Sequence, residues 1–293
     1  MHNFLPAIGF SKLNKKSLDE LIEEIKLRPD EEDVAIDFES NEFVEKRYMV
    51  ADGVALVLRG TYTVEDEFIV DYYYPSFYGN TVSSDGDVEI IKQTDKDNYY
   101  AMCDEVRIGV SLIFQLQNMA EFLRRCEKDV RGYTGGIKLS ALSTEGKILL
   151  PVYSSERIKE KTKINHDKKI DLVEQAREGD ETAMESLALD EIDLYSKISR
   201  RILRQDILTI VSTYFMPYGI ENDKYEILGE ILEVKREINH ITMEELCIMR
   251  LQCNDMELEV CINKKDLYGE PAVGRRFKGY IWLQGTVDFF PEN

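Results

Sequence analysis

The chain has 293 residues, of which 43% are apolar, and its formal net charge at pH 7 is -19. This apolar share is typical of globular proteins, and the length suffices for two domains that each bury a core, so the composition argues against wholesale disorder. The strong negative charge argues against nonspecific nucleic-acid binding, because proteins of that class usually present Lys and Arg to the phosphates.

The sequence also carries signals about compartment and cofactors. No stretch approaches the length of a membrane span, and the apolar run at the start is too short for a signal peptide and is interrupted by Pro6 and Gly9. The five cysteines are odd in number and form no CxxC pair, which fits reduced, buried thiols better than disulfides or zinc. We therefore expect a cytoplasmic protein that has no membrane contact and needs no cofactor.

Residues 1–154 are expected to form an α+β domain, an antiparallel sheet with flanking helices. A short strand is predicted over residues 4–10, followed by a helix that begins with a capping box of Ser17 and Glu20 and ends before Pro29. Three further segments, rich in β-branched and aromatic residues, are predicted to pair as strands: residues 34–38, 53–58 and 68–74.

A second series of elements begins with the alternation of apolar and polar residues over 107–117, which predicts a half-buried strand. Residues 119–126 are then expected to be helical, and residues 137–153 to form a hairpin that turns at residues 143–146. Strand, helix and strands thus occur twice, as in the pseudo-symmetric sheets of glyoxalase-like metal enzymes. The histidines, usual metal ligands of such enzymes, lie outside these strands: His2, His166 and His240.

The middle of the chain separates two predicted domains. Residues 155–169 are charged and lack periodicity, which is typical of a linker. Residues 170–219 are expected to form a helical connector, in which Asp180 caps one helix and Pro217 ends the last one. The remaining residues, 220–293, contain closely spaced strands and are expected to fold as a small β-barrel of OB or SH3-like type.

The last predicted strand has two contrasting faces. Apolar residues and glycines should point inward: Phe277, Gly279, Ile281, Leu283, Gly285 and Val287. The outward face interleaves cations with aromatic and amide side chains: Arg276, Lys278, Tyr280, Trp282 and Gln284. Barrel folds stack bases or sugars on such faces, so these five residues are the candidate ligand-binding site. In the alternative, which the sequence favours, Tyr280 and Trp282 pack on the first domain or the helices as interdomain core.

The sequence offers no catalytic constellation. Residues 269–276 have the glycine spacing of a phosphate loop but lack the Lys followed by Ser or Thr, and a strand rather than a helix should follow. There is no Gly-x-Ser-x-Gly motif, and no histidine is close in sequence to an obvious nucleophile. The aromatic run at residues 72–74 is expected to be mostly sheet packing, because alternate residues of a strand point to opposite faces. No catalytic, cofactor-binding or metal-ligating residue is predicted.

Several short motifs carry a resemblance to a known family. They are Leu-Gln-Asn at residues 116–118, Ile-Ser-Arg-Arg-Ile at 198–202, Phe-Met-Pro-Tyr-Gly at 215–219, Ile-Leu-Gly at 227–229 and Phe-Lys-Gly-Tyr-Ile-Trp-Leu-Gln-Gly at 277–285. With them the chain resembles, over essentially its whole length, an uncharacterised bacterial family defined by a domain of unknown function. The resemblance implies no activity, cofactor or catalytic residue.

The residues therefore favour a non-enzymatic binding or adaptor protein, with a protein rather than a nucleic acid as its partner. Two alternatives stay open. One is a glyoxalase-like metal enzyme in the first domain, and the other is single-stranded nucleic-acid binding through the barrel.

Overall fold

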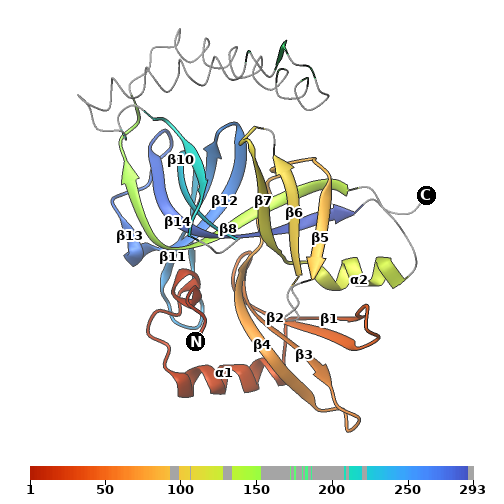
Figure 1. Ribbon diagram of the computed structural model, residues 1–293. Coiled ribbons are helices and arrows are strands. Elements are labelled where there is room, and N and C mark those ends of the chain that lie inside the picture. The colour runs from red at the N-terminus through yellow and green to blue at the C-terminus, as the bar shows by residue number, and fades with distance from the viewer. Residues whose placement is uncertain are drawn as a thin grey trace.

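The computed structural model describes residues 1–92, 99–105, 107–127, 134–152, 211–219 and 223–289, and the single residues 172, 175, 180, 182, 183, 186 and 208. Within these residues the chain is mostly β, with two α-helices, α1 (Lys15–Leu27) and α2 (Met119–Glu127), and two short 3-10 helices, η1 (Leu5–Ile8) and η2 (Lys264–Asp266). The strands form a four-stranded antiparallel sheet and a ten-stranded mixed sheet (Figure 1). Of the expected α+β fold, the described residues bear out a mostly β structure with two helices.

The four-stranded sheet has the order β1-β2-β3-β4. Its strands are β1 (Glu31–Ile36), β2 (Glu42–Ala51), β3 (Val54–Tyr62) and β4 (Phe68–Phe77). The predicted antiparallel pairing is confirmed, whereas β2 was not predicted. β2 buries charged residues such as Glu45 and Lys46 beside apolar ones, so it lacks the alternation that identifies a strand in a sequence.

The ten-stranded sheet contains a closed ring. Its order is β13-β8-β12-β11-β10-β14-β7-β6-β5, with β9 paired to β10. The strands are β5 (Val88–Lys92), β6 (Tyr99–Glu105), β7 (Val110–Leu116), β8 (Thr134–Leu149), β9 (Tyr214–Pro217), β10 (Lys224–Ile238), β11 (Glu245–Cys253), β12 (Met256–Asn263), β13 (Leu267–Tyr268) and β14 (Arg276–Phe289). Because β8 also pairs with β14, the strands β8, β12, β11, β10 and β14 close on themselves.

β8 is one continuous strand, so the predicted hairpin with its turn at residues 143–146 is wrong. Gly146 lies opposite Gly279 of β14, and a Cβ atom on these glycines would come within 2.4 and 2.6 Å, respectively, of the Phe277 ring. The glycine at 146 is thus required by a close approach of two strands and a ring, not by a turn. β8 precedes the predicted linker, yet it closes the ring with strands that follow the linker.

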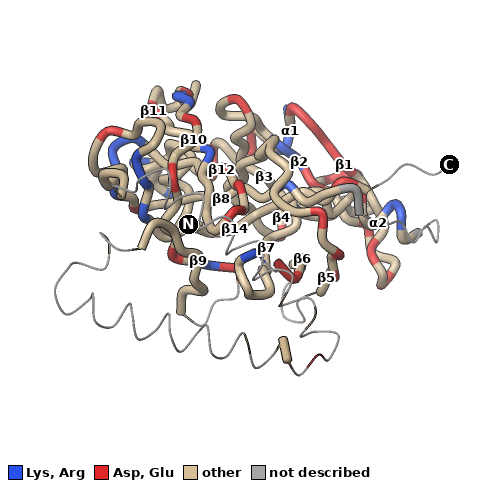
Figure 2. The backbone as a smooth tube through the Cα atoms, turned by 90° about the horizontal axis from the view of Figure 1, so that it is seen from above, with Lys and Arg blue, Asp and Glu red and all other residues tan. Residues whose placement is uncertain are grey.

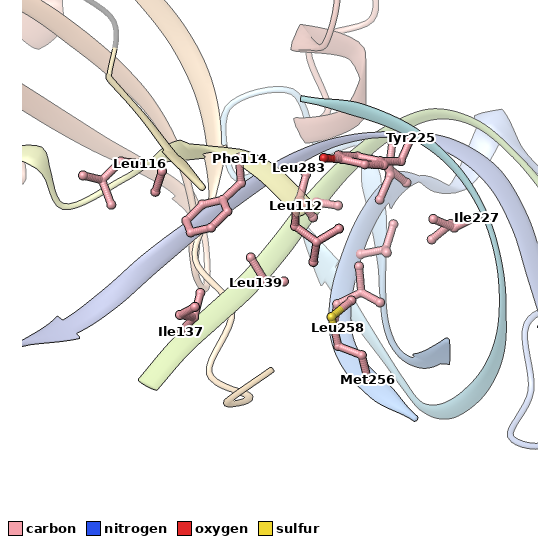
Figure 3. Packing of buried hydrophobic residues seen from close by; sticks show 14 of the residues in the cluster. Leu112, Phe114, Leu116, Ile137, Leu139, Tyr225, Ile227, Met256, Leu258 and Leu283 are labelled. Atoms are coloured by element: carbon pink, nitrogen blue, oxygen red, sulfur yellow. The ribbon is translucent and has the colours of Figure 1, made fainter. Parts of the chain in front are cut away.

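The main core fills the inside of the ring and continues beneath β6, β7 and α2 (Figure 3). The alternation predicted for the last strand is confirmed, because four of its inward side chains are buried in this core: Phe277, Ile281, Leu283 and Val287. The inward faces of β11 and β12 are buried there too: Cys247, Met249, Leu251, Cys253, Leu258, Val260 and Ile262.

A second core lies between the four-stranded sheet, α1, η1 and the outer surface of the ring. The strand predicted over residues 4–10 is wrong, because Pro6 lies in the first turn of the 3-10 helix η1 and Gly9 closes this helix with a φ of 94°. The predicted capping box is also wrong, since Asn14 caps α1 by accepting a hydrogen bond from the Ser17 N–H (2.9 Å). One side of this helix packs into the core with three buried residues: Leu18, Leu21 and Ile25.

The predicted linker, residues 155–169, and most of the predicted connector lie outside the described residues. The cap at Asp180 is confirmed, because its carboxylate accepts hydrogen bonds from the N–H groups of Thr182 (2.8 Å) and Ala183 (3.3 Å). The helix predicted to end at Pro217 is wrong at that end, where the chain forms β9. β9 is anchored by Phe215, which is buried with its ring 4.8 Å from that of Tyr225.

Candidate functional site

The outer face of β14 carries the five residues of the predicted site, and the structure divides them into a covered and an exposed group. Arg276, Trp282 and Gln284 are buried, whereas Lys278 is half-buried and Tyr280 is exposed. All five lie opposite the inward residues of β14, as the alternation predicted. Their different burial follows from what folds over each of them.

Trp282 is covered by the N-terminal segment. Its indole is 6% exposed, with ring centroids 4.8 Å from His2 and 5.5 Å from Phe4. The indole N–H donates to the Asp223 carboxylate (2.6 Å), which satisfies its polar atom. For Trp282 the structure therefore agrees with the packing alternative rather than with an open stacking platform.

Gln284 fastens the end of β4 to the ring. Its side-chain oxygen accepts from the Phe77 N–H (3.0 Å) and its amide nitrogen donates to the Pro75 carbonyl (2.9 Å). Next to Gln284, the side-chain amide of Gln117 donates hydrogen bonds to Ser76 Oγ and to the Phe77 carbonyl, both at 2.8 Å. These buried amides pair the backbone groups that β4 would otherwise leave unsatisfied where the two sheets meet.

Arg276 bonds to backbone carbonyls rather than to an anion. Its guanidinium donates to Leu150 O (3.0 and 2.9 Å), Leu208 O (2.9 Å) and Val211 O (2.8 Å). Burial lowers the pKa of Arg276. These hydrogen bonds hold the chain at the end of β8 and at residues 208 and 211 against the start of β14.

Lys278 belongs to a three-residue network on the open part of the face. Its ammonium lies 2.8 Å from Glu226 Oε1, which also accepts from the Tyr214 hydroxyl (2.7 Å). Burial and the bond to Glu226 raise the pKa of Tyr214 to about 12. Burial tends to raise the pKa of Glu226, but the bonds from Lys278 and Tyr214 outweigh it and the pKa is lowered. The Lys278 charge is therefore balanced within the chain.

Tyr280 forms an exposed aromatic pair with Tyr218. Their ring centroids are 4.4 Å apart at an interplanar angle of 48°. Tyr280 is 37% exposed and Tyr218 is 47% exposed, so much of each ring still meets solvent. Tyr218 follows β9 directly and is held by the bond from its N–H to the Lys224 carbonyl (2.9 Å).

Two further side chains border this pair. Met216 of β9 is 49% exposed, and both Met216 and Tyr280 lie opposite Glu226 in the strand register. Glu145 of β8 lies opposite Tyr280 on the other side and is exposed. We call the side chains of Met216, Tyr218, Tyr280 and Glu145 the exposed aromatic face.

Three members of the exposed aromatic face were missed by the sequence analysis. Residues 214–218 were assigned to the end of a helix, and Glu145 was assigned to a turn. A signal for β9 was present: Phe215 is apolar and buried, whereas the residues on either side of it are not buried. This alternation has the period of a strand and could have identified Met216 and Tyr218.

Comparison with protein families places the chain. Residues 5–285 match the family described as "Domain of unknown function, E. rectale Gene description (DUF3881)". The chain belongs to this family. The resemblance noted in the sequence is thereby confirmed over nearly the whole chain. Neither the curated proteins nor the solved structures contain a match to it.

This DUF3881 chain also buries a charged network that the sequence did not reveal. Arg59 of β3 is 2% exposed and donates to Glu45 Oε2 (2.8 Å) and to the hydroxyls of Tyr72 (2.5 Å) and Tyr74 (3.1 Å). It also donates to the Leu116 carbonyl at the end of β7 (3.4 Å), which links the two sheets. Burial raises the pKa of Tyr72 to about 12, so its hydroxyl keeps its proton.

The expected sheet packing of the aromatic run is confirmed for Tyr74, which is buried. Tyr72 bonds to Arg59 as described. Tyr73 instead borders an open cavity of about 470 Å³ between α1 and β4. The cavity is lined by His2, Ile22, Val70, Asp71, Tyr72 and Tyr73.

The thiols, the possible metal ligands and the hydropathy of the helices complete the description of this DUF3881 chain. The cysteines are free thiols, four of them buried, as the sequence predicted, and burial raises the pKa of Cys103 and of Cys253 to about 12. No group of three or more His, Cys, Asp or Glu within the described residues is placed to hold a metal ion. Within the same residues no helix has the length and hydropathy to cross a membrane.

Proposed function

We propose that this chain is a cytoplasmic, non-enzymatic binding or adaptor protein that docks a protein partner on the exposed aromatic face. The observation that carries the proposal is the Tyr218–Tyr280 pair, whose rings contact each other while Tyr218 stays 47% and Tyr280 stays 37% exposed to solvent. Aromatic residues concentrate at protein interfaces, because they bury a large area for little loss of side-chain entropy.

The surroundings of the pair support the proposal. Tyr280 lies on a strand of the closed ring, and the backbone at Tyr218 is tied to β10. The network of Lys278, Glu226 and Tyr214 fixes the neighbouring side chains. A partner would meet an ordered surface and would lose little free energy in ordering it.

We also propose that the ring of strands β8, β12, β11, β10 and β14 is a small β-barrel of OB or SH3-like type. The four-stranded sheet and η1 brace one side of this barrel. The side next to β9 is left for the partner, which matches the way such barrels use one part of their outer surface.

The two alternatives have less support. The nucleic-acid alternative would use Trp282 and Lys278, but Trp282 is buried and Lys278 is paired with Glu226. The glyoxalase-like alternative would use one sheet made of two similar halves, but β1 to β4 and β5 to β8 belong to different sheets. Both stay predictions: the following experiment tests the nucleic-acid alternative, and metal found by elemental analysis of the purified protein would favour the glyoxalase-like one.

The test is an affinity pull-down of the tagged chain from extract of its native cells, with and without nuclease. Wild type is compared with Tyr218→Ala/Tyr280→Ala and with Phe38→Ala, an exposed aromatic residue in the turn between β1 and β2 that serves as the control. We expect one stoichiometric protein that is retained after nuclease and by Phe38→Ala, and lost with the double variant. Recovery of nucleic acid, or of a protein that ignores the double substitution, would contradict the proposal.

A further inference from the structure

We infer that the partner presents a basic, extended segment to the exposed aromatic face, with an Arg or Lys side chain over Tyr280 and beside Glu145. This inference rests on the proposed function and adds the chemistry of the partner to it. Three observations support it: the charge of the whole chain, the one unbalanced carboxylate on the face, and the width of the face.

The charge of the whole chain favours a basic partner. Asp and Glu number 56 against 37 Lys and Arg, and acidic residues follow one another along α1 and β1 (Figure 2). The field of such a chain attracts a positively charged segment from a distance and raises its rate of association. An acidic segment would be repelled before it made contact.

The two carboxylates beside Tyr280 differ in their partners. Glu226 on β10 is neutralised by Lys278 at 2.8 Å. Glu145 on β8 is exposed and makes no ion pair within the described part of the chain. Glu145 is therefore the carboxylate of the face that an incoming cation can pair with.

Tyr280 adds a second reason to expect a cation at this position. A guanidinium or ammonium over a tyrosine ring gains about 0.5–1 kcal/mol at an exposed site. Arg suits the position best, because its planar group can stack on the ring of Tyr280 while its N–H groups bond to the Glu145 carboxylate. Glu145 and Tyr280 are direct partners in the β8–β14 register, so one side chain can reach both.

Lys147 sets one border of the face. It is exposed on β8, lies opposite Lys278 and makes no ion pair within the described residues. The cation of the partner should therefore lie on the Glu145 side of Tyr280, away from Lys147. Lys147 also supplies a matched control, because removing its charge should not weaken the binding of a basic segment.

The dimensions of the face suit an extended segment. The face extends from β9 across β10 and β14 to β8, which are neighbours in the sheet. Three strand spacings amount to about 14 Å, which about four residues of extended chain can cross. A short linear segment is thus long enough to touch Met216, the tyrosine pair and Glu145.

The experiment is a selection of random displayed peptides on the full chain, with Tyr218→Ala/Tyr280→Ala as the counter-selection that removes peptides bound elsewhere. We expect Arg and Lys to be enriched and Asp and Glu to be depleted in the selected peptides. Enrichment of acidic peptides, or no enrichment over the counter-selection, would overturn the inference. A protein captured in the pull-down would still leave the proposed function standing in that case.

The selected peptide is then titrated by fluorescence anisotropy against single variants. Glu145→Lys should weaken its binding about two- to fivefold, in line with a solvent-exposed ion pair, and added salt should reduce this difference. Lys147→Gln should not weaken it. Equal affinities of wild type and Glu145→Lys, or a larger loss with Lys147→Gln, would overturn the placement of the cation.

Discussion

Trp282 and Tyr280 lie two residues apart on the same face of β14, yet Trp282 is 6% exposed and Tyr280 is 37% exposed. The rings of His2, Phe4 and Tyr74 pack against Trp282, whereas the ring of Tyr280 packs against that of Tyr218, which is itself exposed. The alternation of the strand fixes which face a side chain takes, and distant segments decide whether that face is buried. The comparison thus separates a structural part of the face from a part that is available to a partner.

The largest effect is expected where a charge is buried. Glu45→Gln leaves the Arg59 guanidinium inside the protein without its carboxylate, so we expect the free energy of unfolding to fall by about 3–5 kcal/mol. The matched change at the half-buried Lys278–Glu226 pair, Glu226→Gln, should cost less, about 1 kcal/mol. Urea denaturation of both variants checks this. Similar losses in the two variants would mean that the Arg59 network is not a buried ion pair.

The comparison itself is tested by truncating its two aromatic side chains. Trp282→Ala removes an indole packed between the ring and the N-terminal segment and should cost about 3–5 kcal/mol. Tyr280→Ala removes a side chain that is 37% exposed and packs on another exposed ring, so stability should stay within about 1 kcal/mol of wild type. Thermal and urea unfolding measure both changes. A large loss with Tyr280→Ala would show that Tyr280 is part of the core after all.

A smaller effect is expected at the amide clamp. Gln284→Leu keeps the volume of the side chain but leaves the Phe77 N–H and the Pro75 carbonyl without partners, so it should cost about 1–3 kcal/mol. Lys278→Met serves as the control. Lys278 lies six residues earlier on the same face of β14, in its open part, and this change should alter stability by less than about 1 kcal/mol. Hydrogen exchange at Phe77 should accelerate in Gln284→Leu alone. An unchanged exchange rate there would contradict the clamp.

The smallest effect is a pH dependence. Burial tends to raise the pKa of Glu244, but bonds from Lys265, Ser11 and Asn263 lower it, and the pKa of Glu226 is lowered by Lys278 and Tyr214. Each of these bonds stabilises the fold above the unfolded pKa of about 4.5, and this stability is lost as the pH falls through the lowered folded pKa.

Denaturation in urea at a series of pH values measures this dependence. Stability should be level near neutral pH and then fall by up to about 1.4 kcal/mol per pH unit for each carboxylate. Glu244→Gln and Glu226→Gln should each flatten the fall, because each removes one titrating group. A chain that becomes more stable in acid would contradict the sign.

Much of the secondary structure could be predicted from the sequence, and the reasons for the failures are local. α1, α2 and the strands β11, β12 and β14 follow from periodicity, because one face of each is apolar and the other is polar. β2 and β8 were missed or misjudged for the opposite reason: β2 buries charged residues, and Gly146 serves a close contact that resembles a turn in the sequence.

The candidate site could be predicted only in part. The outward direction of Lys278 and Tyr280 followed from alternation, but their neighbours Met216, Tyr218 and Glu145 come from segments far apart in the sequence. Their proximity depends on β8 and β9 pairing around β14 and β10. The burial of Trp282 likewise depends on His2 and Phe4 of the N-terminal segment, whose position no local pattern reveals.

The most direct test of the central claim is site-specific photocrosslinking in the native cells. A benzophenone amino acid is placed at Tyr280 and, as the control, at Phe38 in the turn between β1 and β2. The account predicts a crosslink from position 280 to one protein, which is lost when Tyr218→Ala is added, and no such product from position 38. No crosslink at position 280, or the same products from both positions, would contradict the claim that the exposed part of the β14 face is the binding surface.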